Sequence, residues 1–165
     1  MSLHARRRWQ ALLVASAVAL VVAVLGMAAT DLGPWYQNLR KPAWQPPDWL
    51  FGPAWTVIYA LIVLSATSAW MAARDRAQRT RIVLLFALNA LLNVGWSALF
   101  FQLRRPDWAL WESALLWLSV LGLILAVRPI SRTAMWLLVP YLAWITFATC
   151  LNLAVVRLNP IIPAG

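Results

Sequence analysis

The sequence predicts an all-α integral membrane protein, a bundle of five transmembrane helices with a long proline- and tryptophan-rich loop between the first two. Three observations predict this fold. The 165 residues are 63% hydrophobic and only 12% charged, against roughly 45–50% and about 25% in a soluble domain. The apolar residues form runs long enough to cross a bilayer, which takes about 20 residues per helix. No stretch remains for a soluble domain, so residues 1–165 form one membrane domain.

The first helix is expected over residues 9–30, because no charge interrupts this run and an arginine triplet precedes it. A secretory signal peptide is the alternative interpretation, with Arg6–Arg8 as its basic region and Gly26–Ala28 as its cleavage site. We favour a retained helix, since the apolar run is long for a signal peptide. Alanines also recur every four residues from Ala11 to Ala23, which would let another helix pack closely.

Residues 31–52 form the expected loop. Prolines at positions 34, 42, 46, 47 and 53 lack an amide proton and hold φ near one value, so they exclude a continuous helix and give a stiff, irregular path. The aromatic rings of Trp35, Tyr36, Trp44, Trp49 and Trp55 suit either the membrane interface or a flat aromatic ligand. A loop this long and irregular is typical of a lid or a binding element.

Four further helices follow the loop, and they are expected over residues 53–73, 82–103, 108–127 and 133–158. Arginines close the first of these helices, and Arg-Pro pairs at 105–106 and 128–129 mark turns. Five spans place the two termini on opposite sides of the membrane.

The net charge of +9 reflects membrane orientation, and we expect no nucleic-acid partner. Nine of the 14 basic residues fall on the side of the N-terminus and five on the side of the loop. Because basic residues accumulate on the cytoplasmic side, the bias predicts a cytoplasmic N-terminus and a loop on the opposite face.

Polar side chains inside the third span are candidates for function, because uncompensated polar groups are costly in a bilayer. Asn89, Asn93 and Ser97 recur every four residues and therefore share one helical face, with Trp96 beside them. They would either bind a ligand or hydrogen-bond a neighbouring helix. We favour the second interpretation.

The fifth span repeats this spacing with Trp144, Ala148 and Asn152, while Leu151 lies one step around the helix. The small Ala148 leaves a gap that admits either a close neighbouring helix or a flat ligand. In the fourth span, Glu112 is the one acidic residue clearly within the apolar run. We expect it near the interface, paired with Arg104 or Arg105.

Common catalytic patterns are missing from the sequence. The single cysteine, Cys150, and the single histidine, His4, lie far apart, so we expect no disulfide framework and no metal site. No serine-histidine-acid set, carboxylate pair or glycine-rich phosphate loop occurs. Conventional hydrolysis and phosphoryl transfer are therefore not expected, and no cofactor is obligatory.

Four segments resemble the successive signatures of the tryptophan-rich sensory protein (TspO)/translocator protein family, also known as peripheral-type benzodiazepine receptors. They read LRKPAWQPPDWLFGPAWTVIY, ALNALLNVGWSALFF, DWALWE and LLVPYLAWITFATCLNLAVVRLN. The resemblance runs from about Gly33 to Asn159, in the right order. It implies a multi-pass bacterial membrane protein of five helices, commonly a homodimer, with a cavity that the first loop caps. Inner and outer membranes both remain open.

The ligands that the resemblance implies are flat and hydrophobic. They are porphyrins such as protoporphyrin IX, haem and related tetrapyrroles, together with sterols in animal members and synthetic benzodiazepine-site drugs. Carried over by motif, the binding residues are Tyr36, Trp44, Trp55, Tyr59, Asn93, Trp96, Trp108, Trp144, Ala148 and Leu151. Animal members carry a proposed sterol motif with a central tyrosine, but Leu153 and Ala154 precede Arg157 here without one. We therefore expect a tetrapyrrole rather than a sterol.

The leading functional prediction is a membrane receptor or sensor that binds porphyrins inside the bundle, under the loop. One alternative is light-dependent porphyrin degradation, in which Trp55 and Trp144 would donate electrons. Another is porphyrin or sterol transport, which is favoured least because no internal repeat is visible. The expected partners are a porphyrin-type small molecule, membrane lipid and a second copy of the chain.

Overall fold

The computed structural model of the chain describes residues 2–160. Its five long helices are α1 (Leu3–Ala29), α3 (Phe51–Ala72), α4 (Arg76–Ser97), α5 (Pro106–Val127) and α6 (Arg132–Leu158). The short elements are α2 (Pro34–Asn38), the 3₁₀ helix η1 (Asp48–Leu50) and the π-helical turn η2 (Ala98–Gln102). Among the described residues, five helical segments are long and apolar enough to cross a membrane. The expected five-helix membrane bundle is confirmed.

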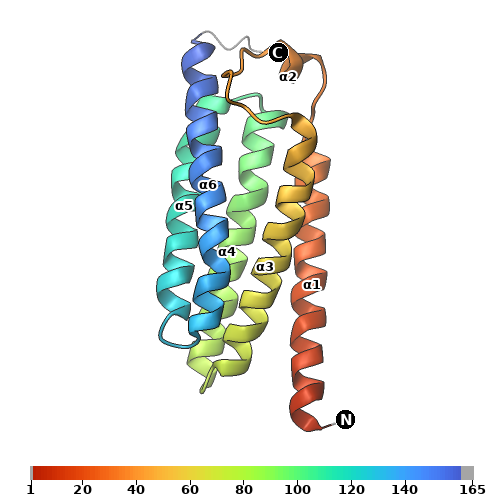
Figure 1. Cartoon of the computed structure of the whole chain (residues 1–165), viewed down its shortest axis with the longest axis vertical. Helices are drawn as coiled ribbons and strands as arrows, with labels where there is room; N and C mark the ends of the chain where they lie inside the picture. The colour runs from red at the N-terminus through yellow and green to blue at the C-terminus, as the bar shows by residue number, and fades with distance from the viewer. Residues whose placement is uncertain (1, 161–165) are drawn as a thin grey trace.

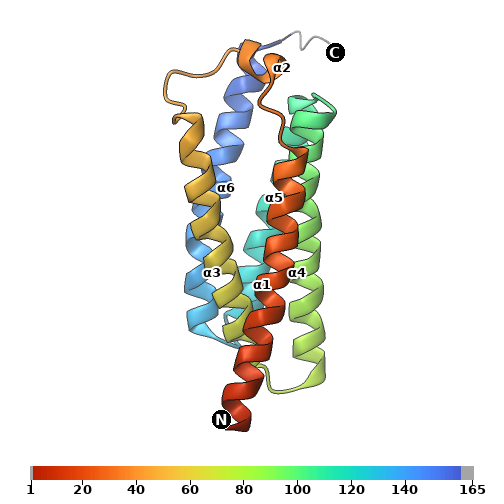
Figure 2. The ribbon, with the colours of Figure 1, turned by 90° about the vertical axis from the view of Figure 1, so that its right-hand side faces the viewer.

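The long helices stand side by side and form a ring (Figure 1 and Figure 2). Around the ring, α1 contacts α3, α3 contacts α6, α6 contacts α5, α5 contacts α4, and α4 returns to α1. The N-terminus lies at one end of the bundle, and the segment 31–52 with α2 covers the other (Figure 1). We call the covered end the loop end and the other the opposite end.

Capping groups set where the helices begin. Asp75 Oδ1 accepts a hydrogen bond from the amide of Gln78 (2.8 Å) at the start of α4, and the Ser2 hydroxyl accepts one from the amide of Ala5 (3.3 Å) at the start of α1. These helices therefore begin before the expected residues 9 and 82. Hydropathy marks only the apolar part of a helix, whereas a cap can start the helix in the polar segment before it.

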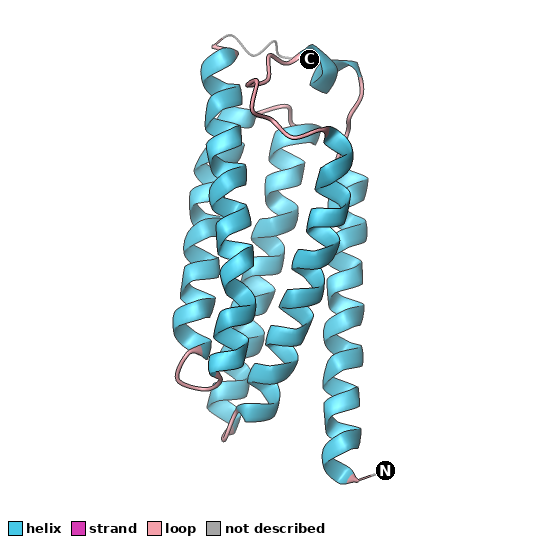
Figure 3. Ribbon diagram, viewed as in Figure 1, coloured by secondary structure: helices cyan, strands magenta, loops and turns pink. Residues whose placement is uncertain are grey.

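The loop between α1 and α3 contains two short helices and is tied to the bundle (Figure 3). Pro34 occupies the first turn of α2, where a missing amide proton costs nothing. The side chain of Asn159, just after α6, accepts from the amide of Arg40 (3.0 Å) and donates to its carbonyl (2.9 Å). The middle of the loop is thus fixed over the end of α6.

Two groups of buried residues hold the bundle together. The larger one fills the opposite end and the middle with small and aliphatic side chains, among them Ala69, Ala73, Val120, Leu123 and Leu138. The smaller one lies at the loop end and is partly aromatic, with Tyr36, Leu39, Phe100, Phe101, Ala109 and Val155. The candidate site lies at the loop end, where the buried side chains include large aromatic rings.

Candidate ligand-binding cavity

A cavity of about 590 Å³ lies inside the ring of helices at the loop end. Its size falls within the roughly 300–1,000 Å³ of small-molecule sites. Side chains from all five long helices, the loop and η2 line it. Nine of the lining residues are aromatic, and they are Tyr36, Trp49, Phe51, Trp55, Tyr59, Trp96, Phe100, Phe101 and Trp144.

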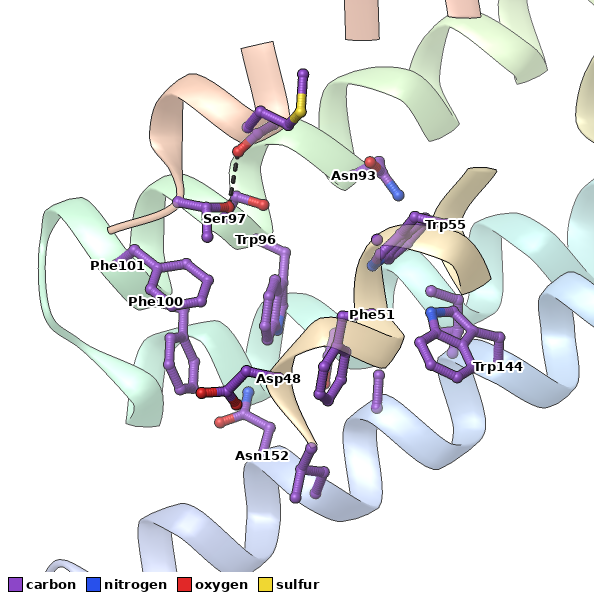
Figure 4. A pocket seen from close by; sticks show the side chains of 18 of the residues that line it. Asp48, Phe51, Trp55, Asn93, Trp96, Ser97, Phe100, Phe101, Trp144 and Asn152 are labelled. Atoms are coloured by element: carbon purple, nitrogen blue, oxygen red, sulfur yellow. Dashed lines mark hydrogen bonds between the residues drawn. The ribbon is translucent and has the colours of Figure 1, made fainter. Parts of the chain in front are cut away.

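One wall of the cavity is built from α3 and α6. Phe51, Trp55 and Tyr59 follow one another at intervals of four residues, so they share one face of α3. The rings of Trp55 and Tyr59 lie 5.4 Å apart between centroids and are tilted by 31°. Trp144 of α6 meets Trp55 edge to face at 6.4 Å and Phe51 at 5.9 Å. Figure 4 shows the rings of Phe51, Trp55 and Trp144 at one side of the cavity.

The second aromatic wall comes from the end of α4. Trp96 stacks on Phe100 at 5.0 Å, and Phe100 lies 4.8 Å from Phe101. The π-helical turn η2 presents both phenylalanines to the interior, where each is buried. Single π-turns often occur at functional sites. Phe101 also contacts Tyr36 of the loop at 5.6 Å, so this wall reaches up to the loop.

The floor of the cavity is a chain of hydrogen bonds across four helices. The Tyr59 hydroxyl donates to Asn93 Oδ1 (2.9 Å), and Asn93 Nδ2 donates to the hydroxyl of Tyr141 (3.2 Å). Tyr141 in turn donates to Asn89 Oδ1 (3.2 Å), and Asn89 Nδ2 donates to Ser119 Oγ (2.8 Å). The interpretation that Asn89 and Asn93 hydrogen-bond neighbouring helices is confirmed. Asn93 also lines the cavity.

The roof of the cavity carries a carboxylate. Asp48 Oδ1 accepts hydrogen bonds from the hydroxyl of Tyr36 (2.8 Å) and from Gln45 Nε2 (3.2 Å). Lys41 Nζ lies 4.0 Å from Asp48 Oδ2 and 3.6 Å from the centre of the Tyr36 ring. Burial, and next the bond to Asp48, raise the pKa of Tyr36 to about 12. The phenol is therefore a protonated donor at neutral pH.

Eight of the ten binding residues expected from the sequence line this cavity, namely Tyr36, Trp55, Tyr59, Asn93, Trp96, Trp144, Ala148 and Leu151. Trp49, which the sequence left open between anchor and ligand contact, lines it as well. The rings that sequence reasoning missed are Phe51, Phe100 and Phe101. Two of the three stand four residues from an expected ring, Phe51 before Trp55 and Phe100 after Trp96, and that spacing could have identified them.

The other two expected residues, Trp44 and Trp108, do not line the cavity. Trp44 lies in a turn closed by the hydrogen bond from the Gln45 amide to the Pro42 carbonyl. Its side chain is half exposed, and its ring packs edge to face with Phe147 of α6. Trp108 is half exposed, and the guanidinium of Arg105 lies 4.4 Å from the centre of its ring. The inward face of α5 is formed instead by Ala109, Ser113 and Leu116.

The expected pairing of Glu112 with Arg104 or Arg105 is wrong. Arg105 is bound to Asp107 through two hydrogen bonds, because Asp107 lies on the same exposed first turn of α5. The turns of the helix carry Glu112 to the buried face, where 9% of its surface is exposed. Its carboxyl oxygens contact no hydrogen-bond partner among residues 2–160.

No cluster of three histidine, cysteine, aspartate or glutamate side chains that could hold a metal ion occurs among the described residues. Cys150 is exposed on α6. Within the described part of the chain, the chemistry of the cavity therefore rests on aromatic rings, amides, hydroxyls and the carboxylate of Asp48.

Comparisons with known proteins agree with this architecture. A sequence profile of the TspO/MBR family matches residues 11–158. The chain is 37% identical to the tryptophan-rich protein TspO of Chlorobaculum tepidum, over 92% of this chain and 98% of the relative. It is 38% identical to the protein of that name from Archaeoglobus fulgidus, over 86% and 95%. It is 34% identical to the human translocator protein, over 76% and 75%. The chain belongs to the TspO/MBR family.

Proposed function

We propose that the chain is a membrane receptor that binds porphyrins or related tetrapyrroles in the cavity beneath the loop. The observation that carries this proposal is a cavity of about 590 Å³ with two aromatic walls, one around Trp55 and one around Trp96. A flat apolar macrocycle buries both of its faces against such walls, and each ring pair contributes about 0.5–1.5 kcal/mol beyond the area buried. The names of relatives, such as the tryptophan-rich sensory protein of Cereibacter sphaeroides, support a sensory role.

Polar groups around the cavity would orient the macrocycle. Asn93 Nδ2 uses one hydrogen for Tyr141, and an amide nitrogen carries two, so one remains for a ligand. Ser97 also lines the cavity. Six lining residues lie between α1 and α3, namely Thr30, Leu32, Tyr36, Gln45, Asp48 and Trp49. A bound macrocycle would therefore hold the loop against the bundle. A partner protein could then recognise the ordered loop, which would transmit the signal.

The floor of the cavity favours binding over passage through the bundle. Tyr141, at its centre, is fully buried, as are Leu138 and Val120 of the core. A ligand that moved on toward the opposite end would have to break the hydrogen-bond chain from Tyr59 to Ser119 and open a packed core. We therefore expect no catalysed flux of porphyrin across liposomes that contain the protein.

Light- and oxygen-dependent breakdown of the bound porphyrin is a second candidate function. Trp55 and Trp144 line the cavity with their rings 6.4 Å apart, and an indole beside a light-excited porphyrin can give it one electron. Dioxygen would be the terminal oxidant. Equal product yields in light and in darkness would contradict this candidate.

A titration of the purified protein with protoporphyrin IX tests the proposed function. We expect saturable binding, followed by the porphyrin absorbance, that weakens at least tenfold when Trp55 and Trp144 are both replaced by alanine. Trp136→Ala is the matched control, since Trp136 lies on α6 but is exposed on the outside of the bundle. Normal affinity in the double variant would overturn the site.

The orientation in the membrane belongs to this proposal. The nine basic residues on the side of the N-terminus are Arg6, Arg7, Arg8, Arg74, Arg76, Arg79, Arg81, Arg128 and Arg132. Their excess supports a cytoplasmic opposite end and a cavity that faces away from the cytoplasm. The test is a reporter enzyme that is active only outside the cytoplasm, fused to the N-terminus. Activity of this reporter would contradict the proposed orientation. The homodimer stays a prediction.

A further inference from the structure

The lining of the cavity carries a negative charge whose ion-pair partner, Lys41, lies outside the lining. Asp48 is the one charged side chain among the described residues that line it, and no lysine, arginine or histidine is present there. The nine aromatic residues add to this character, because the face of an aromatic ring carries partial negative charge. A ligand that enters the cavity therefore meets one carboxylate and several electron-rich rings.

We infer that the mouth of the cavity selects a flat ring ligand that carries a cationic, ammonium-type group beside Asp48, and that it disfavours a carboxylate at this position. The inference rests on the proposed function, because it concerns the same cavity and names the charge of the ligand that fits it. It extends that function, since the proposed function sets no preference for the charge of the ligand.

The position of the carboxylate is fixed before any ligand arrives. Asp48 is the first residue of η1, and its Oδ1 is held by the hydroxyl of Tyr36 and the amide of Gln45. Its Oδ2 has Lys41 Nζ at 4.0 Å, the limit of an ion pair, and a carboxylate oxygen can accept further bonds. Figure 4 shows the side chain of Asp48 projecting among the labelled rings. Oδ1 is thus oriented by two hydrogen bonds, and Oδ2 has only the long ion pair to Lys41.

Lys41 does not give the cavity a positive charge of its own. It is not among the lining residues, and its ammonium group lies over the ring of Tyr36. An ammonium group on a ligand would gain attraction from Asp48 and from nearby rings at once, and both strengthen when water is excluded. A ligand carboxylate in the same place would be repelled by Asp48. A porphyrin dicarboxylate would therefore bind with its propionates turned out past Asp48 toward the exposed loop.

Three ligands with one macrocycle test the inference. They are mesoporphyrin IX with its two propionates, its uncharged dimethyl ester, and the bis-amide whose side chains end in ammonium groups. Each is titrated against the full chain in nanodiscs of zwitterionic phosphatidylcholine, so that the charge of the lipid plays no part. We expect the wild type to bind the ammonium form most tightly and the carboxylate form least tightly.

Asp48→Asn removes the charge and retains a side-chain oxygen that can accept from Tyr36 and Gln45. We expect this variant to weaken the ammonium ligand and to strengthen the carboxylate ligand, each about fivefold, the size typical of a partly exposed charge pair. The ester should change less than twofold. Asp107→Asn is the matched control, because Asp107 lies in the first turn of α5 and does not line the cavity. It should change all three affinities less than twofold.

The salt dependence of the wild type makes the test independent of whether the variant folds. Raising the ionic strength screens exposed charges, so the affinity of the ammonium ligand should fall while that of the ester stays constant. The inference is overturned if Asp48→Asn shifts both charged ligands in the same direction, if Asp107→Asn acts equally, or if the wild type prefers the carboxylate. Failure of all three ligands to bind the wild type would instead overturn the proposed function.

Discussion

The two ends of the helix bundle use the same helices with opposite results. At the opposite end, small and aliphatic side chains such as Ala69 and Ala134 let the helices approach closely, and both residues are fully buried. At the loop end, the same α3 and α6 carry Trp55 and Trp144, whose rings meet edge to face. Large flat rings cannot interdigitate as tightly as small side chains, so a cavity of about 590 Å³ remains.

Helix packing and the candidate binding cavity are therefore separated along the length of the bundle. The opposite end has a core with close side-chain contacts, which is the main source of stability between helices in a membrane. The loop end can then stay open without loss of the fold. The hydrogen-bond chain through Asn93 and Tyr141 marks the border between the two. Substitutions on either side of that border should therefore have different consequences.

The largest effect on stability is expected at the opposite end. Leu138→Ala removes a fully buried side chain from the core, and a cavity of this kind costs about 2–5 kcal/mol. Its counterpart at the loop end, Leu151→Ala, enlarges a cavity that already exists and should cost less than half as much. Unfolding in detergent, followed by circular dichroism, measures both. Equal losses of unfolding free energy in the two variants would contradict the separation of packing from binding along the bundle.

Removing hydrogen bonds from the chain that separates the two ends should have an intermediate effect on the free energy of unfolding. Tyr141→Phe removes a hydroxyl that accepts from Asn93 and donates to Asn89, and unsatisfied buried polar groups cost about 1–3 kcal/mol. Tyr59→Phe removes a single bond, to Asn93, and is the milder control. The same unfolding measurement should rank Tyr141→Phe as the more destabilising change. A larger destabilisation by Tyr59→Phe than by Tyr141→Phe would contradict the position of the border at Tyr141.

Filling the cavity should affect binding rather than folding. Ala148→Leu adds apolar volume to the wall beside Trp144, so we expect porphyrin affinity to fall about tenfold, which is about 1.4 kcal/mol. The unfolding free energy should stay within about 0.5 kcal/mol of the wild type, the usual range for a change that neither opens nor overpacks a core. Ala134→Leu, in the packed end, is the converse change and should destabilise the fold. Unchanged porphyrin affinity in Ala148→Leu would place the ligand outside this cavity.

The smallest effect concerns the roof of the cavity at high pH. The pKa of Tyr36 is raised to about 12, first by burial and then by Asp48. A tyrosine with a raised pKa stabilises the fold through its neutral form, so this contribution is complete below pH ~10 and is lost toward pH 12. Asp48→Asn should lower the pKa of Tyr36 without returning it to about 10, since burial remains. The absorbance of tyrosinate, with Tyr36→Phe as the reference, measures this shift.

Much of this arrangement follows from sequence patterns. Phe51, Trp55 and Tyr59 share a face of α3 because a helix repeats every 3.6 residues, and the same reasoning groups Trp144 with Ala148. The number of spans follows from the lengths of the apolar runs. The caps at Ser2 and Asp75 explain why two helices begin earlier than hydropathy alone suggests.

Other features depend on contacts that lie far apart in the sequence. Phe101 lines the cavity beside Phe100 on the π-helical turn that follows α4, and no sequence signal marked that turn. Trp44 is turned outward against Phe147 by the local path of the loop. Glu112 and Trp108 occupy the same helix, but one is buried and the other half exposed.

The membrane class, the five spans and the residues that share a face of each helix all follow from the order of the amino acids. Which of those faces points into the cavity depends instead on how the helices pack together. The physical reason is that lipid is as apolar as a protein core, so in a membrane the outward face of a helix is as hydrophobic as the inward one. The rotation of α5 that directs Ser113 inward and Trp108 outward is therefore set by its contacts with α4 and α6, which no pattern within α5 alone reveals.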